Sequence, residues 1–319
     1  MNEPIFFTPV FKYRVWGGNN LQSFGYTLPY ERTGECWGIS AHRNGESIVK
    51  GGRYDNVTLR DLYRDEPALF GESLTSEEFP LLVKLLDATD DLSVQVHPND
   101  DEAKQLENDE AYGKTECWYV VDARPGSELI LGHHAETTEE FQKKVAEEDW
   151  HGLLKKVPVQ KGDFVYVPSG TIHAIGKGII ILETQQSSDT TYRVYDFDRV
   201  ESDGKKRELH LDKAIQVTNT PDKQAIGRDN TTISASAGGI INRLVQAPSF
   251  SVYELSVRGE FQFERPGSYL LATVVQGEGT CHTNQQAFSL AAGDHFLLPN
   301  DLRNIVMDGD MTIICSHPN

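Results

Sequence analysis

Cysteine is scarce in this sequence, and its four positions follow no disulfide or metal-binding pattern. Cys36, Cys117, Cys281 and Cys315 are scattered without Cys-x-x-Cys spacing, so they are most simply reduced thiols of a cytoplasmic protein. Long apolar runs are also missing: no apolar stretch of about 18 residues occurs, so we expect no membrane span. The first residues contain no basic segment leading into an apolar one, which argues against secretion.

Basic residues are outnumbered by acidic ones. With 30 Lys and Arg against 48 Asp and Glu, the formal net charge is −18. A surface this negative repels phosphate backbones, so nucleic acid is not expected as a partner. If the substrate is itself an anion, the site that binds it has to gather Lys, Arg or metal charge locally.

The length and the pattern of short runs indicate two β-rich domains. At 319 residues the chain exceeds the size at which one core normally keeps growing. Short β-type runs bounded by Gly, Pro, Asp and Asn dominate residues 6–57, residues 79–197 and the region after 233. Helical segments are expected near residues 58–75, 99–112, 137–155 and 205–225. We therefore predict one domain over residues 1–232, which carries these helical insertions, and a second domain over residues 233–319.

One sequence element occurs twice. The run Gly162-Asp-Phe-Val-Tyr-Val-Pro has a counterpart in Gly293-Asp-His-Phe-Leu-Leu-Pro, with the same spacing from the Gly-Asp turn to the proline. Each run is typical of a turn, a buried strand and a strand stop. The position that matches His173 after the first copy is Asn304 after the second. The repeat predicts two related β-barrels, of which only the first keeps its candidate metal ligands.

Four polar residues from separate segments form the most informative set. Gln95 and His97 are two apart in a Val-rich run, so both side chains leave the same face of a predicted strand. Glu116 opens a second strand-like run, and His173 follows a strand and a tight turn. Two imidazoles, a carboxylate and an amide oxygen suit a divalent ion such as zinc. Taken singly, each histidine is more simply a packed core residue. A purely structural zinc would favour Cys and His ligands, but Cys117 points to the opposite strand face.

Three charged residues lie in or beside predicted buried strands. Lys84 interrupts an apolar run, so it either points into a barrel lumen or snorkels from an edge strand. Lys114 is two residues before Glu116 and shares its face. Glu183 ends a buried apolar run, where it either transfers a proton, orients a ligand or is a solvated carboxylate.

Arg193 and two histidines have plain interpretations when they are considered alone. Arg193 follows a polar stretch and would be a surface arginine paired with Asp196 or Asp198. His133 and His134 precede an acidic helix start, so we expect both to be solvated loop residues.

Several motifs in order resemble a known enzyme family. The Gly-Asp element that ends at His173 resembles the second motif of cupins, and its repeat suggests a double cupin jelly roll. More narrowly, the chain resembles the type I phosphomannose isomerases in their shorter bacterial form. The motifs that carry this resemblance cover most of the first 200 residues and are Tyr13-Arg-Val-Trp-Gly-Gly, Gly34-Glu-Cys-Trp-Gly-Ile-Ser, Phe79-Pro-Leu-Leu-Val-Lys-Leu-Leu-Asp-Ala, Leu92-Ser-Val-Gln-Val-His-Pro-Asn-Asp, Gly113-Lys-Thr-Glu-Cys-Trp-Tyr, the His173 element and Ser187-Ser-Asp-Thr-Thr-Tyr-Arg193.

The resemblance implies a mainly β fold of two cupin-type barrels and a zinc-dependent isomerase. The enzyme would interconvert mannose 6-phosphate and fructose 6-phosphate through an enediolate, with one Zn²⁺ per chain. The residues that the resemblance implies for the site are Gln95, His97, Glu116 and His173 as metal ligands, Arg193, Lys114 and Glu183 as catalytic residues, and Lys84 as a pocket residue. Trp16 is either a packing residue or part of the sugar pocket, and Ser187, Ser188 or a lysine would bind the phosphate.

Two other classes of function stay open at this stage. Another metal cupin enzyme, such as an iron dioxygenase, usually carries a His-x-His pair, whereas this chain has Gln95-x-His97. A non-catalytic sugar-binding module would have no need for Arg193 and the lysines on the open face of the ion. The expected partner is a small sugar phosphate, with neither nucleic acid nor membrane, and the chain is expected to be a monomer or a weak homodimer.

Overall fold

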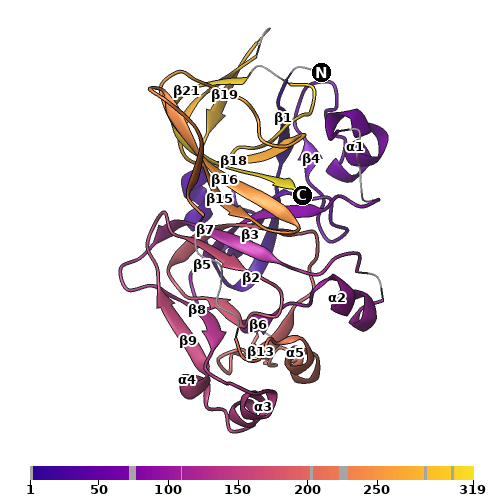
Figure 1. Ribbon diagram of the computed structural model, residues 1–319, viewed down its shortest axis with the longest axis vertical. Helices are drawn as coiled ribbons and strands as arrows, with labels where there is room; N and C mark the ends of the chain where they lie inside the picture. Colours follow the sequence, from indigo (N-terminus) through magenta and orange to yellow (C-terminus); the bar gives the residue numbers. More distant parts are fainter. Residues whose placement is uncertain are drawn as a thin grey trace.

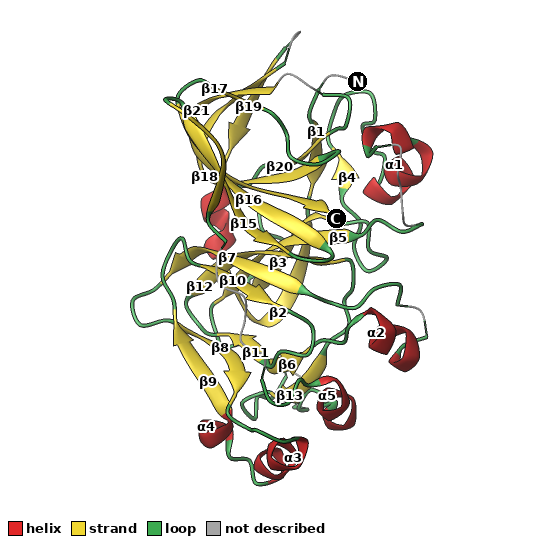
Figure 2. Ribbon diagram, in the orientation of Figure 1, coloured by secondary structure: helices red, strands yellow, loops and turns green. Residues whose placement is uncertain are grey.

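Three β-sheets with short helices at their edges make up the chain, as seen in a computed structural model (Figures 1 and 2). The structure describes residues 3–71, 77–108, 110–201, 204–222, 229–283, 286–302 and 305–319. Within these ranges, no helix combines the length and the apolar character that crossing a membrane takes. All four cysteines are buried and free of disulfides.

A ten-stranded sheet forms the upper part of the molecule in Figure 1. Its order is β14-β15-β16-β21-β18-β20-β1-β4, with β17 on β21 and β19 on β18. The strands of this sheet are β1 (Ile5–Thr8), β4 (Ile48–Val49), β14 (Thr231–Ser236), β15 (Gly239–Gln246), β16 (Phe250–Arg258), β17 (Phe261–Phe263), β18 (Leu270–His282), β19 (Ala287–Ala291), β20 (His295–Leu298) and β21 (Ile305–Pro318). Two N-terminal strands therefore complete a sheet that is otherwise C-terminal.

Two smaller sheets form the lower part. The six-stranded sheet, in the order β10-β7-β12-β5-β3-β2, contains β2 (Val10–Gly18), β3 (Thr33–Ile39), β5 (Leu81–Ala88), β7 (Glu116–Ala123), β10 (Phe164–Val167) and β12 (Ile179–Gln186). The five-stranded sheet, in the order β13-β6-β11-β8-β9, contains β6 (Val94–Val96), β8 (Glu128–His133), β9 (Leu154–Pro158), β11 (His173–Ile175) and β13 (Tyr192–Tyr195). All pairings in these two sheets are antiparallel.

The six-stranded sheet is a central layer that is covered on both faces. Every residue of β3, β5 and β12 is buried. One face of β5, with Leu81, Val83 and Leu85, joins a core that includes Leu271 and Leu297 of the ten-stranded sheet. On the opposite face, Leu86 belongs to a separate apolar cluster, and Lys84 lies on the same side. A charged residue in such a strand needs an ion-pair partner or a polar cavity.

Each predicted helical segment contains a helix, but the helices are shorter than predicted. The helices are η1 (Asn20–Phe24), α1 (Leu59–Asp65), η2 (Pro67–Leu69), α2 (Asp100–Leu106), α3 (Thr138–Ala146), α4 (Trp150–Leu153) and α5 (Leu211–Val217). Asn99 and Glu102 form a complete capping box at the start of α2. At α3, Thr137 accepts a hydrogen bond from the Glu140 N–H, but the Glu140 carboxylate accepts from the Glu136 N–H instead of closing a box.

The predicted mainly β architecture with helical insertions is confirmed. Within the described residues the three sheets stay open, so neither predicted barrel is a closed one. The domain division at residue 232 stays a prediction, and β1 and β4 cross it by pairing in the ten-stranded sheet. Asn304, predicted to match His173 in the repeat, lies outside the described residues. The expectation for His133 is wrong: it is buried at the end of β8, with Nε2 2.9 Å from the Asn219 carbonyl oxygen, whereas His134 is exposed.

Candidate active site

Strand register places three of the predicted site residues in one row of the five-stranded sheet. Gln95 of β6 lies directly opposite His173 of β11 on one side and opposite Arg193 of β13 on the other. Opposed residues in antiparallel strands share a face of the sheet, so these three side chains leave it together. His173 and Arg193 follow Gln95 by 78 and 98 positions in the sequence, so strand pairing rather than a local pattern brings the three together.

A second row lies in the six-stranded sheet. Glu183 of β12 is paired with Lys84 of β5 on one side and with Trp118 of β7 on the other, and Lys84 is in turn paired with Trp37 of β3. The Lys84 ammonium lies 3.4 Å from the Glu183 carboxylate and 4.9 Å from the centre of the Trp37 ring. Lys84 is therefore a buried, paired cation, and the alternative of an edge-strand lysine is wrong.

A tight turn brings the two histidines together. Gly170 has a φ of +80° in the turn before β11, a conformation that favours glycine. Its N–H donates to the His97 carbonyl oxygen over 2.8 Å, which ties the end of β6 to the start of β11. The imidazole rings of His97 and His173 consequently lie with their centres 4.8 Å apart.

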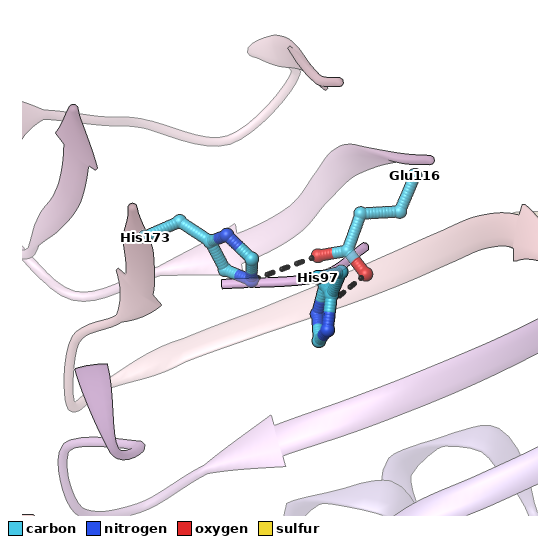
Figure 3. A group of neighbouring side chains, drawn as sticks. All are labelled: His97, Glu116 and His173. Atoms are coloured by element: carbon cyan, nitrogen blue, oxygen red, sulfur yellow. Dashed lines mark ion pairs between the residues drawn. The ribbon is translucent and has the colours of Figure 1, made fainter. Parts of the chain in front are cut away.

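Both imidazoles approach one carboxylate from different sides, as Figure 3 shows. Nε2 of His97 is 3.4 Å from Glu116 Oε2, and Nε2 of His173 is 3.4 Å from Glu116 Oε1. All three side chains are at most 1% exposed. Glu116 Oε1 has no hydrogen-bond partner among the described residues, which is costly for a buried carboxylate oxygen.

The other ring nitrogens of the two histidines fix their tautomers. Nδ1 of His97 lies 2.9 Å from the Thr190 carbonyl oxygen, and Nδ1 of His173 lies 2.9 Å from the Thr171 carbonyl oxygen. Since a carbonyl only accepts, each Nδ1 donates, and each Nε2 keeps its lone pair toward the cluster. Burial lowers the pKa of both imidazoles, to about 3 for His97, so both are neutral at pH 7.

This donor set could hold a metal ion. The ligand atoms of His97, Glu116 and His173 all lie within 4.8 Å of one another. Burial opposes ionisation of Glu116, but the charge of the Lys114 ammonium holds the pKa of its carboxyl well below the usual range. Two neutral nitrogen lone pairs and one carboxylate are the ligands that divalent ions of the zinc type bind.

Lys114 and Gln95 connect the cluster to the neighbouring cavity. The Lys114 ammonium lies 2.8 Å from His97 Nε2 and 2.5 Å from Glu116 Oε2. Two of the candidate metal-ligand atoms therefore already contact a positive charge. Gln95 turns its amide nitrogen toward His173, with 3.3 Å between Nε2 atoms. Rotation of that amide by half a turn would present its oxygen, so a ligand role for Gln95 stays a prediction.

Glu183 is a buried carboxyl with a perturbed pKa. Burial raises the pKa of Glu183, the negative charge of Glu116 raises it further, and the two nearby lysines only partly offset this. Its Oε2 accepts a hydrogen bond from the Trp118 indole over 3.1 Å. A carboxyl group of raised pKa on a cavity wall is a candidate for proton transfer.

The two rows of side chains enclose a polar cavity of about 420 Å³. Of the predicted site residues, Trp16, Lys84, Gln95, Lys114, Glu183 and Arg193 line it. Ser187 is buried but is not among the residues that line the cavity, and its N–H donates to the Pro80 carbonyl oxygen. Its predicted contact with substrate stays a prediction.

Sequence reasoning missed several charged residues of the cavity. Arg14 and Glu35, from β2 and β3, line it as a bidentate ion pair with distances of 2.8 and 3.1 Å. Asp189, Glu201 and Arg207 line it as well. Three of them lie in motifs quoted above: Arg14 in Tyr13-Arg-Val-Trp-Gly-Gly, Glu35 in Gly34-Glu-Cys-Trp-Gly-Ile-Ser, and Asp189 in Ser187-Ser-Asp-Thr-Thr-Tyr-Arg193. The other residues depend on strand pairing and loop placement that no local pattern reveals.

The fold and the site together define a class of protein. A mainly β, cupin-type chain carries a buried His/Glu/His cluster that could bind a metal ion, and the cluster adjoins a polar cavity. Two family profiles match: "Phosphomannose isomerase type I, catalytic domain" over residues 5–117, and "Mannose-6-phosphate isomerase, cupin domain" over residues 240–318. The cupin-type fold is thus confirmed.

Named relatives match over nearly the whole chain. A mannose-6-phosphate isomerase of Streptococcus mutans is 49% identical, covering 100% of this chain and 99% of that protein. A mannose-6-phosphate isomerase of Bacillus subtilis is 47% identical, covering 99% of each. A crystal structure of the mannose 6-phosphate isomerase from Bacillus subtilis has a TM-score of 0.95 at 44% identity, covering 99% of this chain and 100% of that one. The chain belongs to the type I phosphomannose isomerase family of enzymes.

Proposed function

We propose that the protein is a zinc-dependent isomerase that interconverts mannose 6-phosphate and fructose 6-phosphate by moving a proton between C1 and C2. The observation that carries this proposal is the buried Glu116 carboxylate beside a polar cavity. Its two oxygens face the Nε2 lone pairs of His97 and His173, and Oε1 has no hydrogen-bond partner among the described residues. The family membership supports the substrate and the reaction, because the relatives named above are mannose-6-phosphate isomerases. A sugar phosphate also fits the local cluster of Lys and Arg in a chain of net charge −18.

The metal centre would be held by Gln95, His97, Glu116 and His173. When bound there, a zinc ion supplies positive charge that stabilises the developing negative charge on the substrate oxygens. Three neutral ligands and one carboxylate leave a formal charge of +1 on the site, by subtraction from Zn²⁺.

Glu183 is the residue we assign to proton transfer. The reaction removes a proton from one of two adjacent carbons and returns it to the other, so one carboxyl can serve both steps. In the base form it accepts the proton from C2 of the aldose, which gives the enediolate. The proton of the O2 hydroxyl passes to O1, and in the acid form Glu183 delivers its proton to C1, which gives the ketose. Burial raises the pKa of Glu183, which favours the acid form more than in an ordinary carboxyl, and the Trp118 indole orients it.

The cations of the cavity serve charge balance and positioning. Lys84 is held by Glu183 and lies over the Trp37 ring, so it keeps positive charge beside the proton carrier. We assign to Lys114, which lines the cavity, a hydrogen bond to the substrate oxygen that becomes anionic in the enediolate. Trp16 contributes an apolar surface for the sugar at the cavity wall.

The four free, buried thiols support the expected cytoplasmic location.

Isotope exchange tests the reaction directly. In D₂O, the enzyme should convert mannose 6-phosphate to fructose 6-phosphate and introduce solvent deuterium at the transferred position, detected by NMR of the sugar. Glu183→Gln should lose both turnover and exchange while it keeps its metal. Binding of the sugar phosphate without turnover in the metal-loaded wild type would instead indicate a sugar-binding module, and oxygen uptake with bound iron would indicate a dioxygenase.

A further inference from the structure

Strand β6 and the residues that flank it run along the cavity from the metal cluster to the far end. Ser93 and Gln95 both line the cavity, and His97, two residues further on, belongs to the cluster. A strand advances about 6 to 7 Å for every two residues, so Ser93 lies one such step beyond Gln95 on the side away from His97. The end of the cavity at Ser93 is therefore remote from the cluster, as the phosphate of a hexose 6-phosphate is remote from C1 and C2.

Arg193 extends its guanidinium toward this remote end. Although its backbone is paired with Gln95, its Nε lies 3.3 Å from the Ser93 hydroxyl, and its Nη1 donates to the Glu208 carbonyl oxygen over 2.7 Å. The alternative expected from the sequence, an ion pair with Asp196 or Asp198, is wrong: Asp196 is held by Arg199 and Arg207, and Asp198 by Lys206. Within the described residues, Arg193 has no carboxylate ion-pair partner.

Arg207 brings a second guanidinium to the same end of the cavity. Its Nε and Nη2 bind the two oxygens of Asp196 over 2.8 and 2.5 Å, which fixes the plane of the group. In the described part of the chain, Nη1 of Arg207 and Nη2 of Arg193 have no hydrogen-bond partner. Burial lowers the pKa of Arg193, and the charge of Arg207 lowers it further, as expected for two cations held close together. Glu201, which is exposed, is the carboxylate that lines this end.

Among the described residues that line the cavity, Arg193 is the one cation without a carboxylate partner, and Arg207 keeps a free donor beside its pair with Asp196. Arg14 binds Glu35, Lys84 binds Glu183, and Lys114 binds Glu116.

We propose that Arg193, Arg207 and the Ser93 hydroxyl form the subsite that binds the phosphate of the substrate. Two guanidiniums with free donors suit a phosphate dianion, whose oxygens accept several charge-assisted hydrogen bonds. This inference rests on the proposed function for the identity of the sugar, but not for the binding of a phosphate group.

Arg207→Gln tests the subsite, and Arg199→Gln is its matched control. Both arginines pair with Asp196, but only Arg207 lines the cavity. We expect Arg207→Gln to raise KM for mannose 6-phosphate by about 10- to 100-fold, with kcat changed much less, because the lost contact is equally present in substrate and transition state. Competitive inhibition by inorganic phosphate should weaken by a similar factor. Arg207→Lys should recover part of both losses, and Arg199→Gln should leave KM and phosphate inhibition within about twofold of wild type.

Glu201→Gln supplies a change of opposite sign. Removal of this carboxylate should lower KM and strengthen phosphate inhibition by about 2- to 5-fold, because it removes repulsion at a partly solvated site. Equal increases of KM in Arg207→Gln and Arg199→Gln would assign the effect to the Asp196 network and overturn the subsite, as would unchanged phosphate inhibition in Arg207→Gln.

The subsite and the proposed function can fail separately. Binding of inorganic phosphate to the metal-loaded protein, followed by calorimetry, needs no turnover. Weaker phosphate binding in Arg207→Gln together with an inactive wild type would retain the subsite and reject the isomerase. An active wild type with unchanged phosphate binding in Arg207→Gln would do the reverse.

Discussion

The two Gly-Asp elements of this chain share a pattern and differ in what lies around them. Each begins with a glycine of positive φ, Gly162 or Gly293, and continues into a short strand, β10 or β20. The first element leads through the Gly170 turn to His173 and the polar cavity. The second leads into a core of buried apolar side chains that includes Phe261 and Phe296. The repeated element therefore specifies a strand and its turn, and the surrounding strands decide the chemistry.

A histidine in each element makes the difference concrete. His173 and His295 are both 1% exposed, and burial lowers the pKa of both imidazoles. His295 has a neutral hydrogen-bond partner for each ring nitrogen, since Nδ1 lies 2.9 Å from the Thr273 hydroxyl and Nε2 2.9 Å from the Tyr26 hydroxyl. His173 instead directs Nε2 toward Glu116. A buried histidine is thus a candidate ligand only when one nitrogen faces an anionic or open site.

Substitution of each of these two histidines should give the largest difference in metal content and activity. His173→Ala is expected to lose the bound metal, because it removes one of the metal ligands. Without the positive charge of the ion, isomerase activity should fall by at least about 10²- to 10³-fold. His295→Asn should keep one metal per folded chain. Metal content by mass spectrometry, measured beside turnover, checks both; equal metal loss in the two variants would remove the distinction between the regions.

Removal of the proposed proton carrier, Glu183, should reduce activity nearly as much, but without loss of metal. Glu183→Gln is expected to reduce kcat by about 10²- to 10⁴-fold while metal content stays at the wild-type level. The amide keeps the shape and the hydrogen bond from Trp118 but cannot cycle a proton. Steady-state kinetics on metal-loaded protein provide the measurement, and a kcat close to that of wild type would transfer the role of base to another group.

Core truncation in the apolar region should affect stability rather than chemistry. Phe261→Ala removes a fully buried ring and is expected to cost about 3 to 5 kcal/mol of unfolding free energy. Urea unfolding measures this cost. At a temperature where the variant is folded, its metal content and KM should match those of wild type; a shifted KM would mean that the apolar region shapes the cavity.

The smallest effect is expected in the acid stability of the loop network beside β13. Burial raises the pKa of Asp196, but the ion pairs with Arg207 and Arg199 outweigh burial and lower the pKa below its usual value. A lowered folded-state pKa contributes stability above the unfolded-state pKa, and this contribution disappears as pH falls through the folded-state value. The difference in unfolding free energy between wild type and Asp196→Asn should therefore shrink on acidification. Urea unfolding of both proteins at neutral and at acidic pH measures this difference, and a difference that does not shrink would contradict the stabilising role of the Asp196 ion pairs.

The candidate metal cluster of His97, Glu116 and His173 was predictable because its signals are local. The spacing of Gln95 and His97 gives a shared face, and the Gly-Asp element with its turn predicts where His173 emerges. Lys84 and Glu183 were noticed because a charge in an apolar run demands a partner, and each is the other's partner. These inferences need only strand periodicity and the cost of burying charge.

The rest of the site depends on non-local placement. Arg14 is on an ordinary β run and reaches the cavity only because β2 pairs with β3. Arg207 is on a loop whose position follows from Asp196, and no periodicity marks it. The pairing of β1 with β20, near the opposite end of the chain, likewise has no local signal. His133 was misjudged because its buried partner, the Asn219 carbonyl, is far away in sequence.

Metal removal and reconstitution test the central claim most directly. Wild-type protein would be stripped with a chelator, its metal content measured, and the isomerisation of mannose 6-phosphate followed as zinc is added back. We predict negligible turnover without metal and full recovery at one equivalent of zinc per chain, with no recovery in His173→Ala. Full activity in the metal-free wild type, or one bound zinc per chain without any turnover, would contradict the account.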